Sequence, residues 1–222
     1  MTSSRIRLTR RAFTLSALAL LGAGSAAGSA AAQVGAAQMS PEQQAALAAI
    51  QADFGAFRTM QGQFFQTNPD GSQGAGIFVI QRPGKMLFQY APTTPGGQPP
   101  VEMICDGEYV AVIEREIRSQ SFIPLGETPL RLLLADNVDL ATAATIIDFV
   151  VTPEQIVLVL EDANTFYNGR LTLVFDGQTR ALRQWTVLDA NGLETTTVIS
   201  EVQIGAPTDP AWFTIDYSLF QD

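Results

Sequence analysis

The chain has 222 residues, enough for one domain with a substantial core, and its 13 basic and 22 acidic residues give a net charge of −9. This acidic balance argues against nucleic-acid binding, because that affinity depends on Lys and Arg side chains that neutralise phosphates. The sequence has no histidine, which excludes Ser-His-Asp and Cys-His catalysis and removes the commonest transition-metal ligand, so we expect no enzyme, no metal site and no cofactor.

Residues 1–32 differ in composition from the rest of the chain and predict a cleavable export signal. Its apolar run, residues 12–23, is too short for a membrane anchor, because spanning a bilayer takes roughly 20 apolar residues. Residues 9–15 (TRRAFTL) resemble a twin-arginine export motif, although a Sec signal can also carry paired arginines. Four arginines precede the apolar run: Arg5, Arg7, Arg10 and Arg11.

Cleavage after residue 32 would leave residues 33–222 as a single domain. Four of the 13 basic residues would leave with the signal, so nine would remain against 22 acidic ones, a net charge of −13. Such a surface also argues against permanent adhesion to anionic lipid head groups.

An amphipathic helix is predicted to begin at Ser40, which is a suitable N-cap. Pro41 fits the first turn, and Glu42 lies near the positive end of the helix dipole. We expect the apolar face of this helix to pack on a sheet. That face consists of four residues at helical spacing: Leu47, Ile50, Phe54 and Phe57.

After Met60 the hydrophobic period changes to two, and turn residues arrive every eight to twelve positions. Short turns such as Pro83-Gly84 and Asp106-Gly107 join strands that must pair antiparallel. The pattern favours one long sheet that curls, with helices available to fill an unclosed mouth. Eleven strands are predicted, at residues 61–67, 74–81, 85–90, 101–105, 108–115, 117–123, 145–151, 156–161, 170–176, 181–188 and 193–204.

Residues 128–134 (TPLRLLL) predict a second, short helix that is apolar on all sides. We expect Thr128 as its cap and Pro129 at its first position. The single cysteine, Cys105, has no partner for an internal disulfide, and we expect a small buried residue at a strand end rather than a reactive thiol.

The hairpin over residues 76–90 carries one apolar face on each strand. Arg82 shares the inner face of the first strand, where burial of its guanidinium would be costly without hydrogen-bond acceptors. The C-terminal carbonyls of a short helix that closes the mouth could accept those bonds. The alternative is that Arg82 is simply exposed before a Pro-Gly turn. The apolar faces consist of Phe78, Ile80, Met86, Phe88 and Tyr90.

Six motifs, in this order and spacing, resemble the periplasmic lipoprotein carrier family LolA. They are residues 60–66 (MQGQFFQ), 82–90 (RPGKMLFQY), 105–107 (CDG), 128–134 (TPLRLLL), 189–192 (DANG) and 209–213 (DPAWF). The resemblance implies an α+β, mainly β fold: a single antiparallel sheet of about eleven strands, curled into a half-open barrel and lidded by short helices.

The same resemblance implies a periplasmic carrier that shields acyl chains. Its partners would be acylated lipoproteins, the inner-membrane ABC transporter that releases them and an outer-membrane acceptor, and the carrier would be a monomer that binds no nucleic acid. Arg82 matches the arginine that locks the lid while the cavity is empty. Exposing a chain of about sixteen carbons to water costs about 12 kcal/mol, which an apolar cavity would offset. We expect acyl chains to contact Phe78, Ile80, Met86, Phe88, Tyr90, Leu130, Leu132 and Leu133.

Two other functions stay open at this point. A lipid-binding sensor or regulatory domain on the same half-barrel would hold a stable membrane signalling partner and transfer no acyl chain. A hydrolase that uses only carboxylates would need two acidic residues converging in a cleft. For any single apolar residue named above, an ordinary place in the core is an equally good interpretation.

Overall fold

The structure, a computed structural model, describes residues 39–136, 143–161 and 169–220. The predicted export signal at residues 1–32 lies outside the described residues. No helix in the described ranges is long and apolar enough to cross a membrane.

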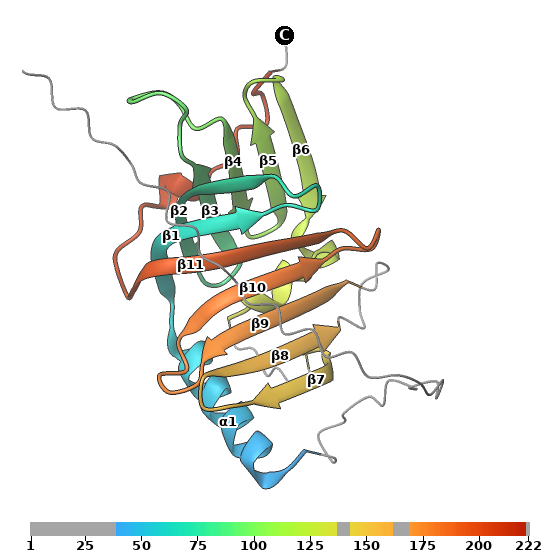
Figure 1. The fold of residues 1–222 in the computed structure, drawn as a ribbon. Helices are drawn as coiled ribbons and strands as arrows, with labels where there is room; N and C mark the ends of the chain where they lie inside the picture. Colours follow the sequence, from blue (N-terminus) through green and yellow to red (C-terminus); the bar gives the residue numbers. More distant parts are fainter. Residues whose placement is uncertain (1–38, 137–142, 162–168, 221–222) are drawn as a thin grey trace, which may run out of the picture. The chain divides into compact units, whose positions relative to one another are not determined.

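Eleven strands form one antiparallel sheet in the order β6-β5-β4-β3-β2-β1-β11-β10-β9-β8-β7 (Figure 1). The first and last strands pair at its centre, and among the described residues its two edges, β6 and β7, do not pair with each other. The sheet is therefore open, and the predicted fold class and all eleven strands are confirmed. The strands are β1 (Thr59–Thr67), β2 (Gln73–Gln81), β3 (Lys85–Tyr90), β4 (Val101–Asp106), β5 (Tyr109–Glu114), β6 (Ser119–Pro124), β7 (Thr145–Val151), β8 (Gln155–Glu161), β9 (Arg170–Asp176), β10 (Leu182–Leu188) and β11 (Glu194–Ile204).

The inner face of the sheet carries the main hydrophobic core. Alternate residues of the strands point to it, so that Phe78, Phe88 and Leu158 are almost fully buried. The ring of Phe175 on β9 meets that of Phe54 edge to face, with ring centroids 5.8 Å apart.

Helix α1 (Pro41–Ala56) begins as predicted. Ser40 is its N-cap, and the Ser40 and Gln43 side chains each accept a hydrogen bond from the other residue's backbone N–H. Three of the four predicted apolar residues are buried helix positions that join the main core, while the fourth, Phe57, follows the helix end and is also buried. The Gln43 amide donates a hydrogen bond of 2.7 Å to the Phe149 carbonyl, which ties α1 to β7.

The second helical region differs from the prediction at its start. A 3-10 turn, η2 (Leu125–Glu127), comes first, and helix α2 (Leu130–Leu134) follows it. Thr128 does not cap α2: its hydroxyl donates to the Leu125 carbonyl at 3.1 Å, and Pro129 takes the N-cap position instead. The reason is that Thr128 is the C-cap of η2: its backbone N–H also donates to the Leu125 carbonyl, at 3.0 Å, so the residue ends that turn and does not begin α2.

The outer face of β2 to β5 is covered by the C-terminal segment with its 3-10 turn η3 (Pro210–Phe213), which forms a second, smaller core. Cys105 lies on the inner face, fully buried and free. Burial raises the pKa of its thiol to about 11. The prediction of a small buried residue at a strand end is confirmed.

Candidate functional site: a lidded apolar pocket

A pocket of about 610 Å³ opens on the inner side of the sheet. Most of its wall is hydrophobic, and it takes side chains from strands that are far apart in the sequence, from η2 and from the start of α2. The volume of this pocket and its mostly hydrophobic wall are typical of a binding site for an apolar ligand. The apolar side chains that line it include Met86, Phe88, Met103, Val110, Val112, Leu130, Trp185 and Val187.

Three of the eight predicted acyl-contacting residues, Met86, Phe88 and Leu130, lie in the pocket wall. Phe78, Ile80, Leu132 and Leu133 are buried in the main core, and Tyr90 packs against that core without lining the pocket. Alternation places all the strand residues on the inner face but does not say which of them the neighbouring side chains and the lid cover.

Sequence reasoning missed the far wall of the pocket. Trp185 and Val187 on β10 stand opposite the predicted hairpin, and Trp185 contacts the ring of Phe88 with centroids 6.0 Å apart. The alternation of β10 indicates an inner face, but only the curl of the sheet brings that face toward β3.

Helices α1 and α2, which pack on the inner face of the sheet and are called the lid below, both contact Arg82, and only 3% of the surface of this arginine is exposed. Its Nε and Nη2 donate to the Leu133 carbonyl of α2 at 3.0 and 2.7 Å, and its Nη1 donates to the Phe54 carbonyl of α1 at 2.5 Å. Both acceptors lie in the last turn of a helix, where carbonyls lack partners within the helix and carry partial negative charge. The exposed alternative for Arg82 is therefore wrong.

Two aromatic rings flank the same guanidinium. Its Cζ lies 4.1 Å from the ring centroid of Phe54 and 3.8 Å from that of Phe57. The faces of these rings attract the positive charge of the guanidinium and thereby stabilise it after burial has removed its hydration water. Burial, and to a smaller extent the charge of Arg58, lowers the pKa of Arg82 to about 9, which leaves it charged at neutral pH.

The β2–β3 turn holds α2 by its backbone as well. The Gly84 N–H donates to the Leu134 carbonyl at 2.8 Å. Gly84 has φ of +75°, and a Cβ there would lie 2.9 Å from the Gly107 Cα. Only glycine fits a left-handed backbone that close to another chain segment.

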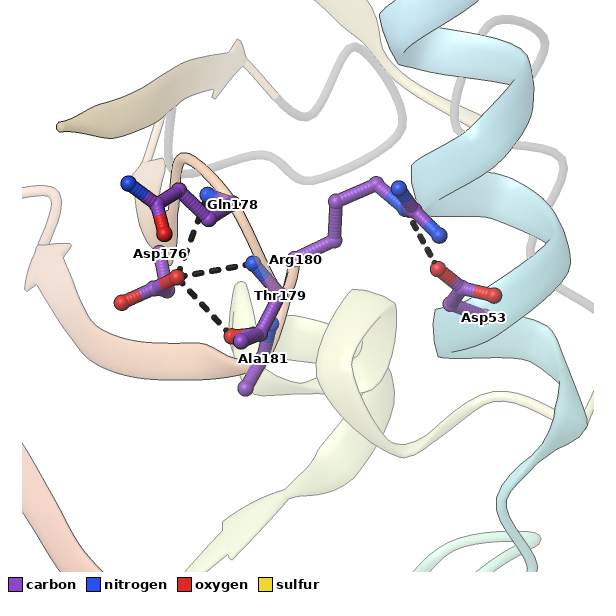
Figure 2. A network of polar contacts seen from close by, with 6 residues as sticks. All are labelled: Asp53, Asp176, Gln178, Thr179, Arg180 and Ala181. Atoms are coloured by element: carbon purple, nitrogen blue, oxygen red, sulfur yellow. Dashed lines mark hydrogen bonds and ion pairs between the residues drawn. The ribbon is translucent and has the colours of Figure 1, made fainter. Parts of the chain in front are cut away.

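Ion pairs on the surface join the helices to each other and to the sheet. Arg58, after α1, pairs with Asp136, after α2. In Figure 2, Arg180 reaches from the β9–β10 turn to α1, where its Nε lies 2.6 Å from the Asp53 carboxylate. Asp176 organises that turn by accepting hydrogen bonds from Gln178 and Thr179 (Figure 2).

The hydrogen bonds from Thr179, first its backbone N–H and then its hydroxyl, lower the pKa of Asp176 to about 2. This carboxylate is therefore a structural anion at neutral pH. It positions the exposed Arg180–Asp53 pair, which by itself contributes little stability.

Polar side chains gather at one end of the pocket. Gln66 on β1 pairs directly with Thr197 on β11, and both are buried in the wall. Burial raises the pKa of the neighbouring Tyr90 to about 12, while its hydrogen bond with Gln66 acts in the opposite direction. The sequence alone shows that Gln66 is a polar residue at an inward position of β1. Only the pairing of β1 with β11 shows that Gln66 lies beside Thr197.

Two carboxylates, those of Glu127 and Asp189, lie in the pocket lining. The Asp189 carboxylate accepts backbone N–H bonds from Asn191 and Leu193 and thereby shapes the β10–β11 turn. Among the described residues there is no cluster of three or more potential metal ligands of the His, Cys, Asp and Glu types.

Several solved structures are similar to the described fold at low sequence identity. A LolA superfamily protein from Nitrosomonas europaea has a TM-score of 0.40 at 11% identity, over 77% of this chain and 98% of its own. A DUF1329 family protein from Desulfovibrio piger has a TM-score of 0.48 at 10% identity, over 79% and 97% of the two chains. LprF from Mycobacterium bovis has a TM-score of 0.37 at 12% identity, over 77% and 96%.

A comparison with curated proteins finds no match. The family comparison does: residues 55–216, which include every strand, match the model for the outer membrane lipoprotein carrier protein LolA. The chain therefore belongs to the LolA family.

Proposed function

We propose that this protein is a periplasmic carrier that binds the acyl chains of lipoproteins released from the inner membrane and ferries them to the outer membrane. The observation that carries the proposal is the apolar pocket of about 610 Å³, together with the hydrogen bonds that join Arg82 to the carbonyls of helices α1 and α2. Shielding a chain of about sixteen carbons is worth about 12 kcal/mol, and burial in such a wall supplies it without demanding one ligand shape.

Release of the acyl chain requires an interaction within the protein that forms only when the pocket is empty and so competes with the ligand. In this proposal, Arg82 locks the empty lid by its bonds to Leu133 and Phe54, and loading breaks those bonds. The pocket widens as the lid moves, so that residues now in the core, such as Phe78 and Leu132, become available to the chains. Since closing the empty site is favourable, it lowers the net affinity and makes hand-over to an acceptor possible.

The test is capture of lipoproteins from inner-membrane vesicles that contain the lipoprotein-releasing ABC transporter. We expect the protein to take up a triacylated lipoprotein on addition of ATP and to leave the same lipoprotein behind when its lipid-bearing cysteine is replaced. Val187→Asp, which places a charge in the pocket wall, should abolish capture. The matched control, Val198→Asp, adds the same charge at an exposed position of the neighbouring strand and should capture normally.

Capture that ignores acylation would contradict the carrier proposal. It would instead favour the alternative, a sensor or regulatory domain that recognises a protein partner. Equal capture by Val187→Asp and by the unmodified protein would show that the pocket is not the site.

A further inference from the structure

The polar side chains at one end of the pocket are the least expected part of its lining. Gln66 is 8% exposed and Thr197 is 2% exposed, yet both line a pocket whose other walls are mostly hydrocarbon. Thr195, two residues before Thr197 and so on the same face of β11, lines it too. Burying polar groups beside an apolar ligand is costly unless they are hydrogen-bonded.

The strand register places these groups at a defined end. Starting from the lid turn, Met86 pairs with Ile80 and Phe88 pairs with Phe78. Farther along the same strands, Gln66 pairs with Gly74 on one side and with Thr197 on the other. Along these strands, the lining is therefore apolar toward the β2–β3 turn and polar at the opposite end.

At this polar end of the pocket, the hydroxyl of Thr197 is available to donate a hydrogen bond to a ligand. The Gln66 amide is held by a 2.7 Å bond to the Asn68 side chain and by its bond with Tyr90. The Thr197 hydroxyl makes one contact of 3.5 Å to the Gln66 Oε1, at the outer limit for a hydrogen bond. A hydroxyl held so weakly can turn to a better acceptor at little cost.

The charge of the lining selects the kind of acceptor. Among the described lining residues there is no Lys or Arg, and the ionisable ones are Glu127 and Asp189, both acidic. A carboxylate ligand would meet no cation here, whereas a neutral carbonyl oxygen needs only a hydroxyl donor. The group that adjoins every esterified or amide-linked acyl chain is such a carbonyl.

We propose that Thr197 and Thr195, with Gln66 positioned behind Thr197, bind the neutral carbonyl by which an acyl chain is joined through an ester or amide bond. This proposal rests on the carrier function above and adds an orientation: the carbonyl lies against β1 and β11, and the hydrocarbon tail points toward Met86 and the lid turn. Ester- or amide-linked chains should then bind more tightly than free hydrocarbon or free fatty acid.

Trp185 in the pocket wall provides the readout, because bromine atoms on a bound chain quench its fluorescence. Trp212→Phe removes the other tryptophan, which is exposed in η3. Four dibrominated probes of equal chain length are titrated into the purified protein: the alkane, the methyl ester, the N-methyl amide and the free acid. We expect the ester or amide to bind on the order of fivefold more tightly than the alkane, as one net hydrogen bond predicts.

The isosteric change Thr197→Val should lower the ester-to-alkane affinity ratio, and the double change Thr195→Val with Thr197→Val should bring that ratio to about one. Thr196→Val, on the opposite face of the same strand, is the matched control and should keep the preference. Tighter binding of only the ester or only the amide supports the proposal and identifies which of these two linkages the site binds.

Equal quenching by the alkane, ester and amide in the unmodified pocket would overturn the carbonyl site while leaving acyl binding intact. Tighter binding of the free acid would overturn it as well. Absence of quenching by every probe would instead contradict the proposed function itself, together with the carbonyl site.

Discussion

Replacement of Arg82 by leucine is the sharpest test of how the lid works. The change removes three hydrogen bonds but keeps an apolar side chain between Phe54 and Phe57. In the closed lid it leaves two buried carbonyls, those of Leu133 and Phe54, without their donor. An unsatisfied buried acceptor costs about 1–3 kcal/mol, so the two carbonyls together cost the closed state about 2–6 kcal/mol, and about 3 kcal/mol is a conservative value within that range.

A loss of about 3 kcal/mol shifts the lid equilibrium toward the open state by more than a hundredfold. Because closure of the empty site competes with the ligand, Arg82→Leu should load normally and release slowly. The fold should survive, since the loss is smaller than the stability of an ordinary domain, about 5–15 kcal/mol. The assay measures transfer of labelled lipoprotein from the loaded carrier to acceptor membranes.

Arg183→Leu is the matched control, because Arg183 is an exposed arginine on β10 that pairs with Asp176 outside the lid. It should release its cargo at the normal rate. Release by Arg82→Leu at the same rate as the unmodified protein would refute the lock. Failure of Arg82→Leu to load would show that the arginine serves binding instead.

Two further substitutions and one thiol-labelling experiment test the packing around the site. Gly84→Ala should lower the free energy of unfolding by about 1–3 kcal/mol in urea titration, more than Gly71→Ala, since both have positive φ but only Gly84 approaches Gly107 closely. Leu133→Ala should lower it by about 2–5 kcal/mol, because the side chain is fully buried; a smaller loss in the same titration would mean that the lid packs loosely. Cys105 should resist a thiol reagent at pH 8 in the folded protein and react in urea, because burial raises its pKa to about 11; rapid reaction of the folded protein would contradict its burial.

Much of the fold follows from local patterns. The N-cap at Ser40 and the turn glycines act within a few residues, so the start of α1 and the strand ends lie where the sequence predicts them, to within two residues. The short turns also force most neighbouring strands to pair. The exceptions are β3 with β4 and β8 with β9, which longer segments join, and the central pair, β1 with β11. The error at Thr128 arose because this residue ends the preceding turn η2, so that its hydroxyl donates back to the Leu125 carbonyl and does not cap the start of α2.

The candidate site was predicted less completely, because each of its walls depends on contacts between distant segments. All four inner-face residues of the hairpin, Phe78, Ile80, Met86 and Phe88, are buried in the main core, but only Met86 and Phe88 also line the pocket. The two pairs carry the same alternation. The two pairs differ only in which side chains from other segments pack over them, and the sequence of the hairpin does not determine those contacts.

The sequence alone determines the elements of this protein, because hydrophobic period, caps and turn residues act over a few positions. It also indicates that Arg82 must find acceptors if buried. Only the tertiary structure decides that those acceptors are the carbonyls of Leu133 and Phe54 and that Trp185 faces the hairpin. These contacts join segments separated by tens of residues, and the curl of the sheet, which sums small twists over eleven strands, sets which of them meet.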